Sequence, residues 1–180
     1  MRADAARNLD AVLRAAARLV ADDPSASISA IAEAAGVGKR TIYRRFESRE
    51  ELLTAIFRAR LDALEVVVDE AMADQRPFPI ALHSFAAGGI RVSREWPVDI
   101  RTATDEGVQR RRGQLNTRIG QFLRRGQQEG LLRTDLPAAW PDALLRAMLR
   151  TAAQEFQEIA PPEAAELVTD TLLHGLTTKA

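Results

Sequence analysis

Helical periodicity runs through almost the whole of this sequence. In residues 4–22, apolar side chains recur at steps of three and four, which places them on one face of an α-helix. These residues are Leu9, Val12, Leu13, Ala16 and Val20. Runs that alternate apolar and polar residues, as half-buried strands do, are absent, and so are internal repeats and low-complexity tracts. The sequence therefore predicts an all-α fold.

Start and stop signals divide the chain into about nine helices. Ser27 is suited to cap a helix over 28–35 that ends at Gly36, and Ser48 with Glu51 forms a capping box. Beyond residues 4–22 and 28–35, a short helix follows Gly38 and a long one spans 48–74. The remaining helices are predicted at 79–94, 98–110, 114–130, 138–158 and 163–177, with Gly113 and Gly130 among the breaks. We expect two domains, residues 1–50 and 51–180.

Composition excludes several classes of protein. The chain has 180 residues, enough for a real core, and no cysteine, which excludes disulfides, thiolate nucleophiles and cysteine-based metal sites. The H-E-x-x-H, G-x-S-x-G and P-loop patterns do not occur. No apolar run is long enough to span a membrane, and the N-terminus lacks the apolar region of a signal peptide. We expect a soluble, cytoplasmic protein that is not an enzyme and holds no metal or cofactor.

Charge is balanced overall but unevenly distributed. The chain carries 25 basic and 25 acidic residues, so nothing global indicates a nucleic-acid partner. Residues 37–49, however, contain five basic residues and one acidic residue, whereas residues 133–180 contain four basic and seven acidic residues. The five basic residues of the first segment are Lys39, Arg40, Arg44, Arg45 and Arg49.

The basic segment has the spacing of a helix that reads DNA. On a helix over 39–46, Ile42 and Phe46 share one face and turn inward, while Arg40 and Arg44 lie opposite them, beside Thr41 and Tyr43. Because the helix over 28–35 ends only a short turn earlier, the two form a helix-turn-helix, whose second helix enters the DNA major groove.

A solvated basic face is the alternative interpretation. A second cluster is equally dense but lacks the paired-helix arrangement, and we interpret it as solvated surface. It consists of Arg110, Arg111, Arg112, Arg118, Arg124 and Arg125. If the first cluster were also only solvated, the chain would be an all-α ligand- or partner-binding protein without DNA binding.

Residues 28–53, ISAIAEAAGVGKRTIYRRFESREELL, resemble the DNA-binding segment of TetR-family transcriptional regulators. The shared marks are the IA-x-x-AGV helix and turn, the T-[LI]-Y-x-x-F recognition helix, and a basic residue three positions before Leu52. The resemblance implies phosphate contacts for Thr41, Tyr43 and Arg49. It implies base-facing roles for Lys39, Arg40 and Arg44. Two positions depart from the family: Gly38, often Ser or Thr, and Arg40, commonly a small residue.

The resemblance also implies a homodimer on a (pseudo)palindromic double-stranded operator, acting as a repressor that a small-molecule inducer releases, and dimerisation through the last two helices. The helix over 138–158 agrees, because it is apolar on two sides and has to be covered twice. One stripe contains Trp140, Leu144, Ala147, Met148 and Thr151, and the other contains Leu145, Leu149, Ala152, Phe156 and Ile159. A single large internal core is the alternative.

A site for the effector is expected among the middle helices, again from the resemblance. The candidate lining residues are Phe85, Trp96, Arg101, Asp105, Phe122, Trp140 and Met148. An aromatic residue at helical spacing belongs to the core more often than to a ligand wall, so a purely structural role for the aromatics stays open.

Overall fold

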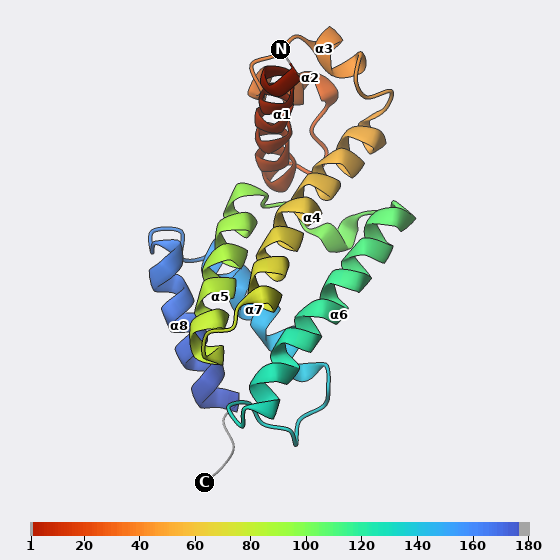
Figure 1. Cartoon of the computed structure of the whole chain (residues 1–180). Coiled ribbons are helices and arrows are strands. Elements are labelled where there is room, and N and C mark those ends of the chain that lie inside the picture. Colours follow the sequence, from red (N-terminus) through yellow and green to blue (C-terminus); the bar gives the residue numbers. More distant parts are fainter. Residues whose placement is uncertain (1, 177–180) are drawn as a thin grey trace. The chain divides into compact units, whose positions relative to one another are not determined.

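The computed structural model describes the backbone of residues 2–176 and most of their side chains. Within that range the chain forms eight α-helices and one 3-10 turn, and no strand (Figure 1). The all-α prediction is confirmed, with one helix fewer than the nine expected. The helices are α1 (Arg2–Asp22), α2 (Ile28–Ala34), α3 (Lys39–Tyr43), α4 (Arg49–Ala73), α5 (Phe78–Glu95), α6 (Glu106–Gln128), α7 (Trp140–Gln154) and α8 (Pro161–Leu176).

One predicted break is wrong. Instead of helices at 98–110 and 114–130, the chain makes a 3-10 turn at Ile100–Thr102 and then the single helix α6, which passes through Gly113. The start of α6 is set by Asp105, whose Oδ1 accepts the Val108 N–H at 2.9 Å. A glycine inside a helix costs only about 1 kcal/mol relative to alanine. The 23 residues of α6 absorb that cost.

The chain divides into two compact units. The first comprises the residues up to Asp62 together with Glu95–Arg111, and the second comprises Ala63–Arg94 and the residues from Arg112 onward. The helices α4, α5 and α6 each run from one unit into the other. No helix in the described part of the chain has the length and apolarity to cross a membrane.

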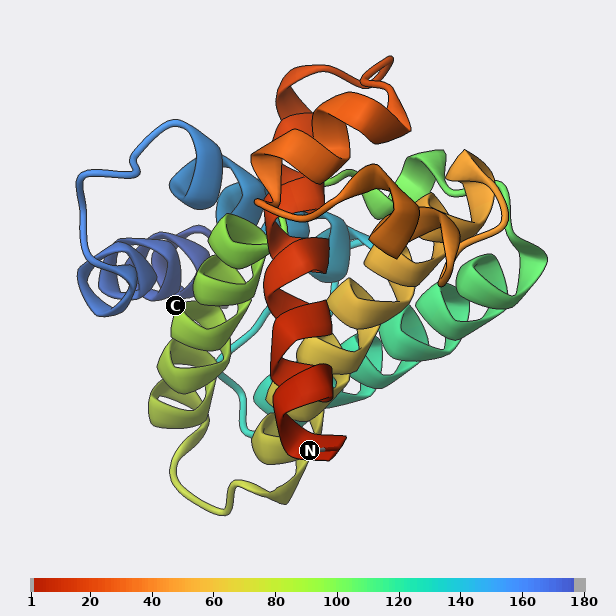
Figure 2. The ribbon, with the colours of Figure 1, turned by 90° about the horizontal axis from the view of Figure 1, so that it is seen from above.

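In the first unit, α2 packs on α1 and α3 packs on α2 (Figures 1 and 2). Two predicted local signals are present. The hydroxyl of Ser27 accepts the Ala30 N–H at 3.2 Å, and Gly36 has a φ of +64°, the left-handed conformation that ends α2. The buried side chains of this core include Val12, Ile31, Ile42, Phe46, Leu52 and Ile56.

The core of the second unit is aromatic and tightly packed. The ring of Phe122 lies between those of Phe78 and Phe85, with centroid distances of 5.3 and 5.4 Å. A Cβ atom on Gly126 would lie 2.5 Å from the Phe78 ring, and one on Gly88 would lie 2.9 Å from Val67. Both glycines therefore permit a close approach that any side chain would prevent.

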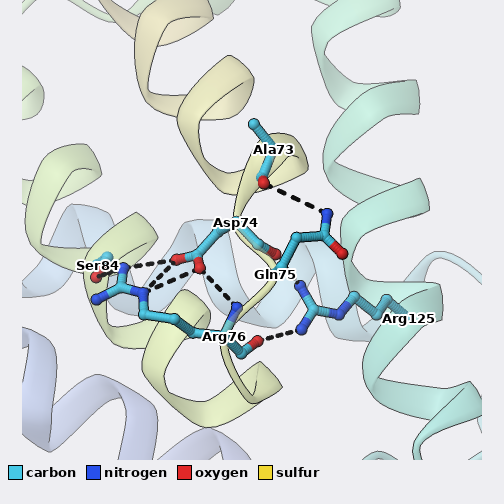
Figure 3. Close-up of polar contacts among 6 residues, drawn as sticks. All are labelled: Ala73, Asp74, Gln75, Arg76, Ser84 and Arg125. Carbon is cyan, nitrogen blue, oxygen red and sulfur yellow. Dashed lines mark hydrogen bonds and ion pairs between the residues drawn. The ribbon is translucent and has the colours of Figure 1, made fainter.

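Arginines spaced seven residues apart on α6 bond to α4 and to the residue that follows it. Arg111 pairs with Asp62 at 2.6 Å, Arg118 pairs with Asp69, and Arg125 donates to the carbonyl oxygen of Asp74 at 2.6 Å. The residue numbers of the bonded partners increase along both segments, so the two helices run parallel. Figure 3 shows the last of these contacts, where Arg125 also donates to the carbonyl of Arg76, and Arg76 in turn pairs with the Asp74 carboxylate.

Candidate nucleic-acid interface

A tight turn joins α2 to α3. After the left-handed Gly36, the Val37 N–H donates to the carbonyl of Ala32 at 2.9 Å, and Gly38 takes the extended conformation of an N-cap, with φ −67° and ψ 139°. Gly38 supplies no side-chain cap, as expected from the missing hydroxyl. The helix α3 is five residues long, and Arg44 is its C-cap. The two helices and this turn form a helix-turn-helix.

The orientation of α3 is set by two apolar side chains. Ile42 is 2% exposed and Phe46 is 6% exposed, and the α2 residues Ile31 and Ala32 are buried as well. The predicted inward face is therefore confirmed. On the other side, six consecutive or nearly consecutive polar side chains are exposed: Lys39, Arg40, Thr41, Tyr43, Arg44 and Arg45.

The exposed face of α3 offers cations that pair with no acidic side chain in the described part of the chain. Lys39 Nζ lies 5.7 Å from the centroid of the Tyr43 ring, within the range of a cation–π contact, so the ammonium and the phenol are presented together. Among the described residues, Arg40 and Arg44 have no ion pair within the chain. Arg45 lies exposed on the same segment, and its charge was the only sign of it in the sequence, because no motif position implies a contact for it.

Arg49 is placed differently from the other basic residues. Its Nε donates to the carbonyl of Ala26 at 3.1 Å, and its Nη2 donates to the carbonyl of Pro24. These bonds fasten the loop between α1 and α2 to the first residue of α4, and they occupy two of the five guanidinium N–H donors. Any phosphate contact of Arg49 has to use the remaining donors.

The start of α4 is capped, although not by the complete predicted box. Ser48 Oγ accepts the Glu51 N–H at 3.1 Å, as predicted. The Glu51 carboxylate reaches back to the N–H of Glu47, at 2.6 Å, where a capping box would use the N–H of Ser48. Together the two hydrogen bonds close the chain segment between α3 and α4.

The residues predicted for the effector site fall in both compact units. In the first unit, Trp96 is fully buried, Arg101 is paired with the Asp99 carboxylate at 2.6 Å, and Asp105 caps α6 and lies 3.6 Å from Arg58. The hydrogen bond to Val108 and the charge of Arg58 lower the pKa of Asp105, and Arg101 likewise lowers the pKa of Asp99. Each of these polar groups already has a structural partner.

In the second unit, the structure brings two of the predicted aromatics together. Phe85 and Phe122 are buried in ring contact, Met148 is half-buried, and Trp140 is exposed at the start of α7. An open hollow of about 420 Å³ lies at the end of α4, and none of these four residues lines it. Its walls are formed by Val67, Glu70, Ala71, Ala73, Asp74, Arg76 and Ser84.

A second open hollow, of about 520 Å³, lies along α4 in the first unit and includes Asp105 in its wall. Glu50, Glu51, Arg58 and Asp62 give the rest of that wall a mixed charge. No group of three or more His, Cys, Asp or Glu residues in the described part of the chain is arranged to hold a metal ion.

Comparison with known proteins supports the interpretation of α1–α4. The family model for "Bacterial regulatory proteins, tetR family" matches residues 12–56, which contain the whole helix-turn-helix. The HTH-type transcriptional repressor LfrR of Mycolicibacterium smegmatis is 37% identical over 76 residues, a segment that covers 42% of this chain and 40% of the relative's length. Residues 12–56 therefore match the tetR family. The resemblance found in residues 28–53 is therefore confirmed, and the family consists of regulatory proteins rather than enzymes.

Solved structures of transcriptional regulators extend the likeness in fold to nearly the whole chain. LfrR from Mycobacterium smegmatis in complex with proflavine has a TM-score of 0.77 at 22% identity and covers 98% of this chain and 99% of its own. PfmR from Thermus thermophilus has a TM-score of 0.74 at 22% identity, covering 93% and 99%. KstR2 of Mycobacterium tuberculosis has a TM-score of 0.76 at 18% identity, covering 93% and 94%.

Proposed function

We propose that this chain is a cytoplasmic transcriptional repressor, which binds a (pseudo)palindromic operator as a homodimer and is released by a small-molecule inducer. The observation that carries the proposal is the orientation of α3, where Ile42 and Phe46 are buried and a continuous row of cations and hydroxyls faces outward. In this proposal residues 1–50 bind DNA, and residues 51–180 bind the inducer and dimerise. A partner-binding protein without DNA binding is not favoured, because the family match falls on the helix-turn-helix itself.

The chemistry of the α3 face suits the two kinds of contact that DNA requires. A guanidinium can donate to O6 and N7 of guanine together, so Arg40 and Arg44, with Lys39, take the base-facing roles. The hydroxyls of Thr41 and Tyr43 and the remaining donors of Arg49 suit phosphate oxygens, which fix the register without reading sequence. We assign Arg45, which is exposed beside them, to the phosphates as well.

The surface of α7 and α8 supports a homodimer. Of the two apolar stripes on α7, Leu145 and Leu149 are buried, whereas Trp140 is exposed and Met148 is half-buried. On α8, Leu167 is also exposed. A second copy would cover this open stripe through the same surface on both subunits. The two helix-turn-helix segments of the dimer, here called the DNA-binding heads, would then lie about 34–36 Å apart and meet successive major grooves.

The inducer site is proposed around Phe85, Phe122 and Met148, with Trp96, Arg101, Asp105 and Trp140 as the remaining candidates. LfrR, a relative that shares the fold, has been solved in complex with proflavine, which supports a small-molecule site in this chain. The inducer has to bind the arrangement that cannot hold DNA more tightly than the one that can, because equal affinity would shift nothing.

The test is selection of duplexes from a random pool by the wild-type protein, followed by titration of the selected duplex at several salt concentrations. Affinity should fall steeply with salt, by a slope of about 0.9 for each phosphate neutralised. Tyr43→Phe should weaken binding to all duplexes alike. Arg44→Ala should in addition relax discrimination at one base position, by roughly 1–3 kcal/mol.

Arg124→Ala is the matched control, because Arg124 is exposed on α6 and lies outside the interface. It should leave affinity nearly unchanged. Failure to select any duplex, or an equal loss with Arg124→Ala and Arg44→Ala, would contradict DNA binding through α3. An equal loss on every duplex variant for Arg44→Ala would move Arg44 from the bases to the phosphates.

A further inference from the structure

The segment that follows α5 belongs to the same compact unit as the helix-turn-helix. Residues Glu95–Arg111 group with α1, α2, α3 and the first half of α4, whereas the earlier residues of α5 belong to the second unit. The contacts between α1 and residues Glu95 and Trp96 therefore lie within one compact unit.

Arg14, on α1, contacts Glu95 and Trp96 through two different interactions. Its guanidinium carbon lies 4.9 Å from the centroid of the Trp96 ring, and its Nη1 donates to Glu95 Oε2 at 2.5 Å. Its Nε donates to Asp10 Oδ2 at 2.8 Å, which orients the guanidinium from within α1. The hydrogen bonds to Asp10 and then to Glu95 raise the pKa of Arg14. Trp96 is only 1% exposed, so the stack covers a buried ring.

Arg60, on α4, holds the same tryptophan from its backbone. Its Nη1 donates to the carbonyl oxygen of Trp96. Burial lowers the pKa of Arg60 to about 10, and the nearby Asp99 charge acts in the opposite direction. A buried cation is a poor way to gain stability, because its desolvation offsets most of the attraction. Its presence here favours a role in fixing position.

We propose that Arg14, Glu95 and Trp96 are positioning residues for DNA binding, which fasten α1 to the end of α5 and so set how α3 is presented. This group, together with Arg60, is called the Trp96 clamp. The inference rests on the proposed function. It adds a specific attachment between α1, which supports the helix-turn-helix, and residues Glu95 and Trp96. The path is short: Trp96 holds α1, α1 supports α2, and α2 supports α3.

The clamp is tested by two substitutions that change the net charge in opposite directions. Arg14→Ala removes a cation and Glu95→Ala removes an anion, so simple attraction to DNA predicts weaker binding for the first and tighter binding for the second. The Trp96 clamp predicts that both bind the selected duplex more weakly, by about fivefold or more, because a loosened head must be ordered on binding. In the double variant the second substitution should add little.

Arg18→Ala is the control, since Arg18 is exposed one turn further along α1 and removes the same charge as Arg14→Ala. It should leave affinity nearly unchanged. Thermal unfolding of each variant establishes that it is folded under the binding conditions. Amide hydrogen exchange without DNA should be faster in α1–α3 for Arg14→Ala and Glu95→Ala, and unchanged for Arg18→Ala.

Affinity shifts of opposite sign for Arg14→Ala and Glu95→Ala, or unchanged exchange in α1–α3, would overturn the clamp. If the wild-type protein selects no duplex at all, the proposed function fails. The exchange comparison would still decide whether the clamp holds α1, because it needs no DNA.

Discussion

At the scale of single residues, uncharged residues decide as much as charged ones. The row of cations on α3 faces outward because Ile42 and Phe46 are buried four residues apart, and neither residue touches DNA itself in the proposed mode. In the second unit, glycines play the corresponding role. Gly126 lets α6 approach the fully buried ring of Phe78, whereas Gly120, six residues earlier, has open space where a Cβ would lie.

Gly126→Ala and Gly120→Ala should therefore have opposite effects on stability. At Gly126 the added methyl would lie 2.5 Å from the Phe78 ring, so the ring must shift, at a cost typical of overpacking, about 1–3 kcal/mol. At Gly120 alanine gains helix propensity without a clash, which should stabilise the protein by up to about 1 kcal/mol. The measurement is the midpoint of urea unfolding for the two variants. A more stable Gly126→Ala protein would show that Phe78 relaxes freely.

At the scale of elements, the ends of helices are held by side chains from elsewhere in the fold. The end of α6 bonds to the segment between α4 and α5 and to the start of α5. Arg125 donates to the carbonyl of Asp74, and Glu129, just after α6, accepts the Phe78 N–H at 3.3 Å. Between α4 and α5, Arg76 is hydrogen-bonded to both oxygens of the Asp74 carboxylate (Figure 3). In the last turn of α7, the carbonyl oxygen of Ala152 accepts a hydrogen bond from Arg94 at 3.2 Å, so Arg94 caps that helix.

The Asp74–Arg76 pair should make part of the stability dependent on acid. Hydrogen bonds from Arg76 lower the pKa of Asp74 from 3.8 to about 2. Because the folded-state pKa is the lower one, the contribution is present above pH 3.8 and disappears as the pH falls through 2. Asp74→Asn should thus lower the thermal midpoint at about pH 5, and the difference from wild type should shrink toward about pH 2. Glu158→Gln, at an exposed loop residue, is the control. A constant difference across this range would contradict the pairing.

At the scale of the whole molecule, the proposed function requires two copies. A single α3 offers too little contact for a long operator, whereas a dimer presents two heads to one face of the duplex. The open apolar stripe on α7 and the exposed Leu167 on α8 are the parts of the described surface that support such an interface.

Leu167→Glu should therefore convert the protein to a monomer and, with the loss of the second half-site, weaken operator binding. A buried, unpaired carboxylate in an apolar interface is strongly unfavourable. Val66→Glu is a close control, because Val66 is 54% exposed on α4 and Leu167 is 59% exposed on α8. Sedimentation velocity measures the oligomeric state of the two variants. A wild-type monomer, or a dimer that survives Leu167→Glu, would contradict dimerisation through α8.

Much of the fold could be predicted because its signals are local. The caps at Ser27 and Ser48, the left-handed Gly36 and the inward pair Ile42 and Phe46 each depend on residues within a few positions of one another. Such signals act through a single turn of helix, so they are visible in the sequence. The helix break expected at Gly113 was wrong, because a single glycine is a weak local signal and did not end the long helix α6.

The sequence by itself determined an all-α chain with a helix-turn-helix whose basic face points outward, because helical spacing and capping are properties of neighbouring residues. Only the tertiary structure decided that Arg49 bonds the carbonyls of the α1–α2 loop and that Trp96 lies buried beneath Arg14. Tertiary structure likewise decided which stripe of α7 is covered. These features depend on residues that lie far apart in the sequence, and only packing of the folded chain brings such residues into contact.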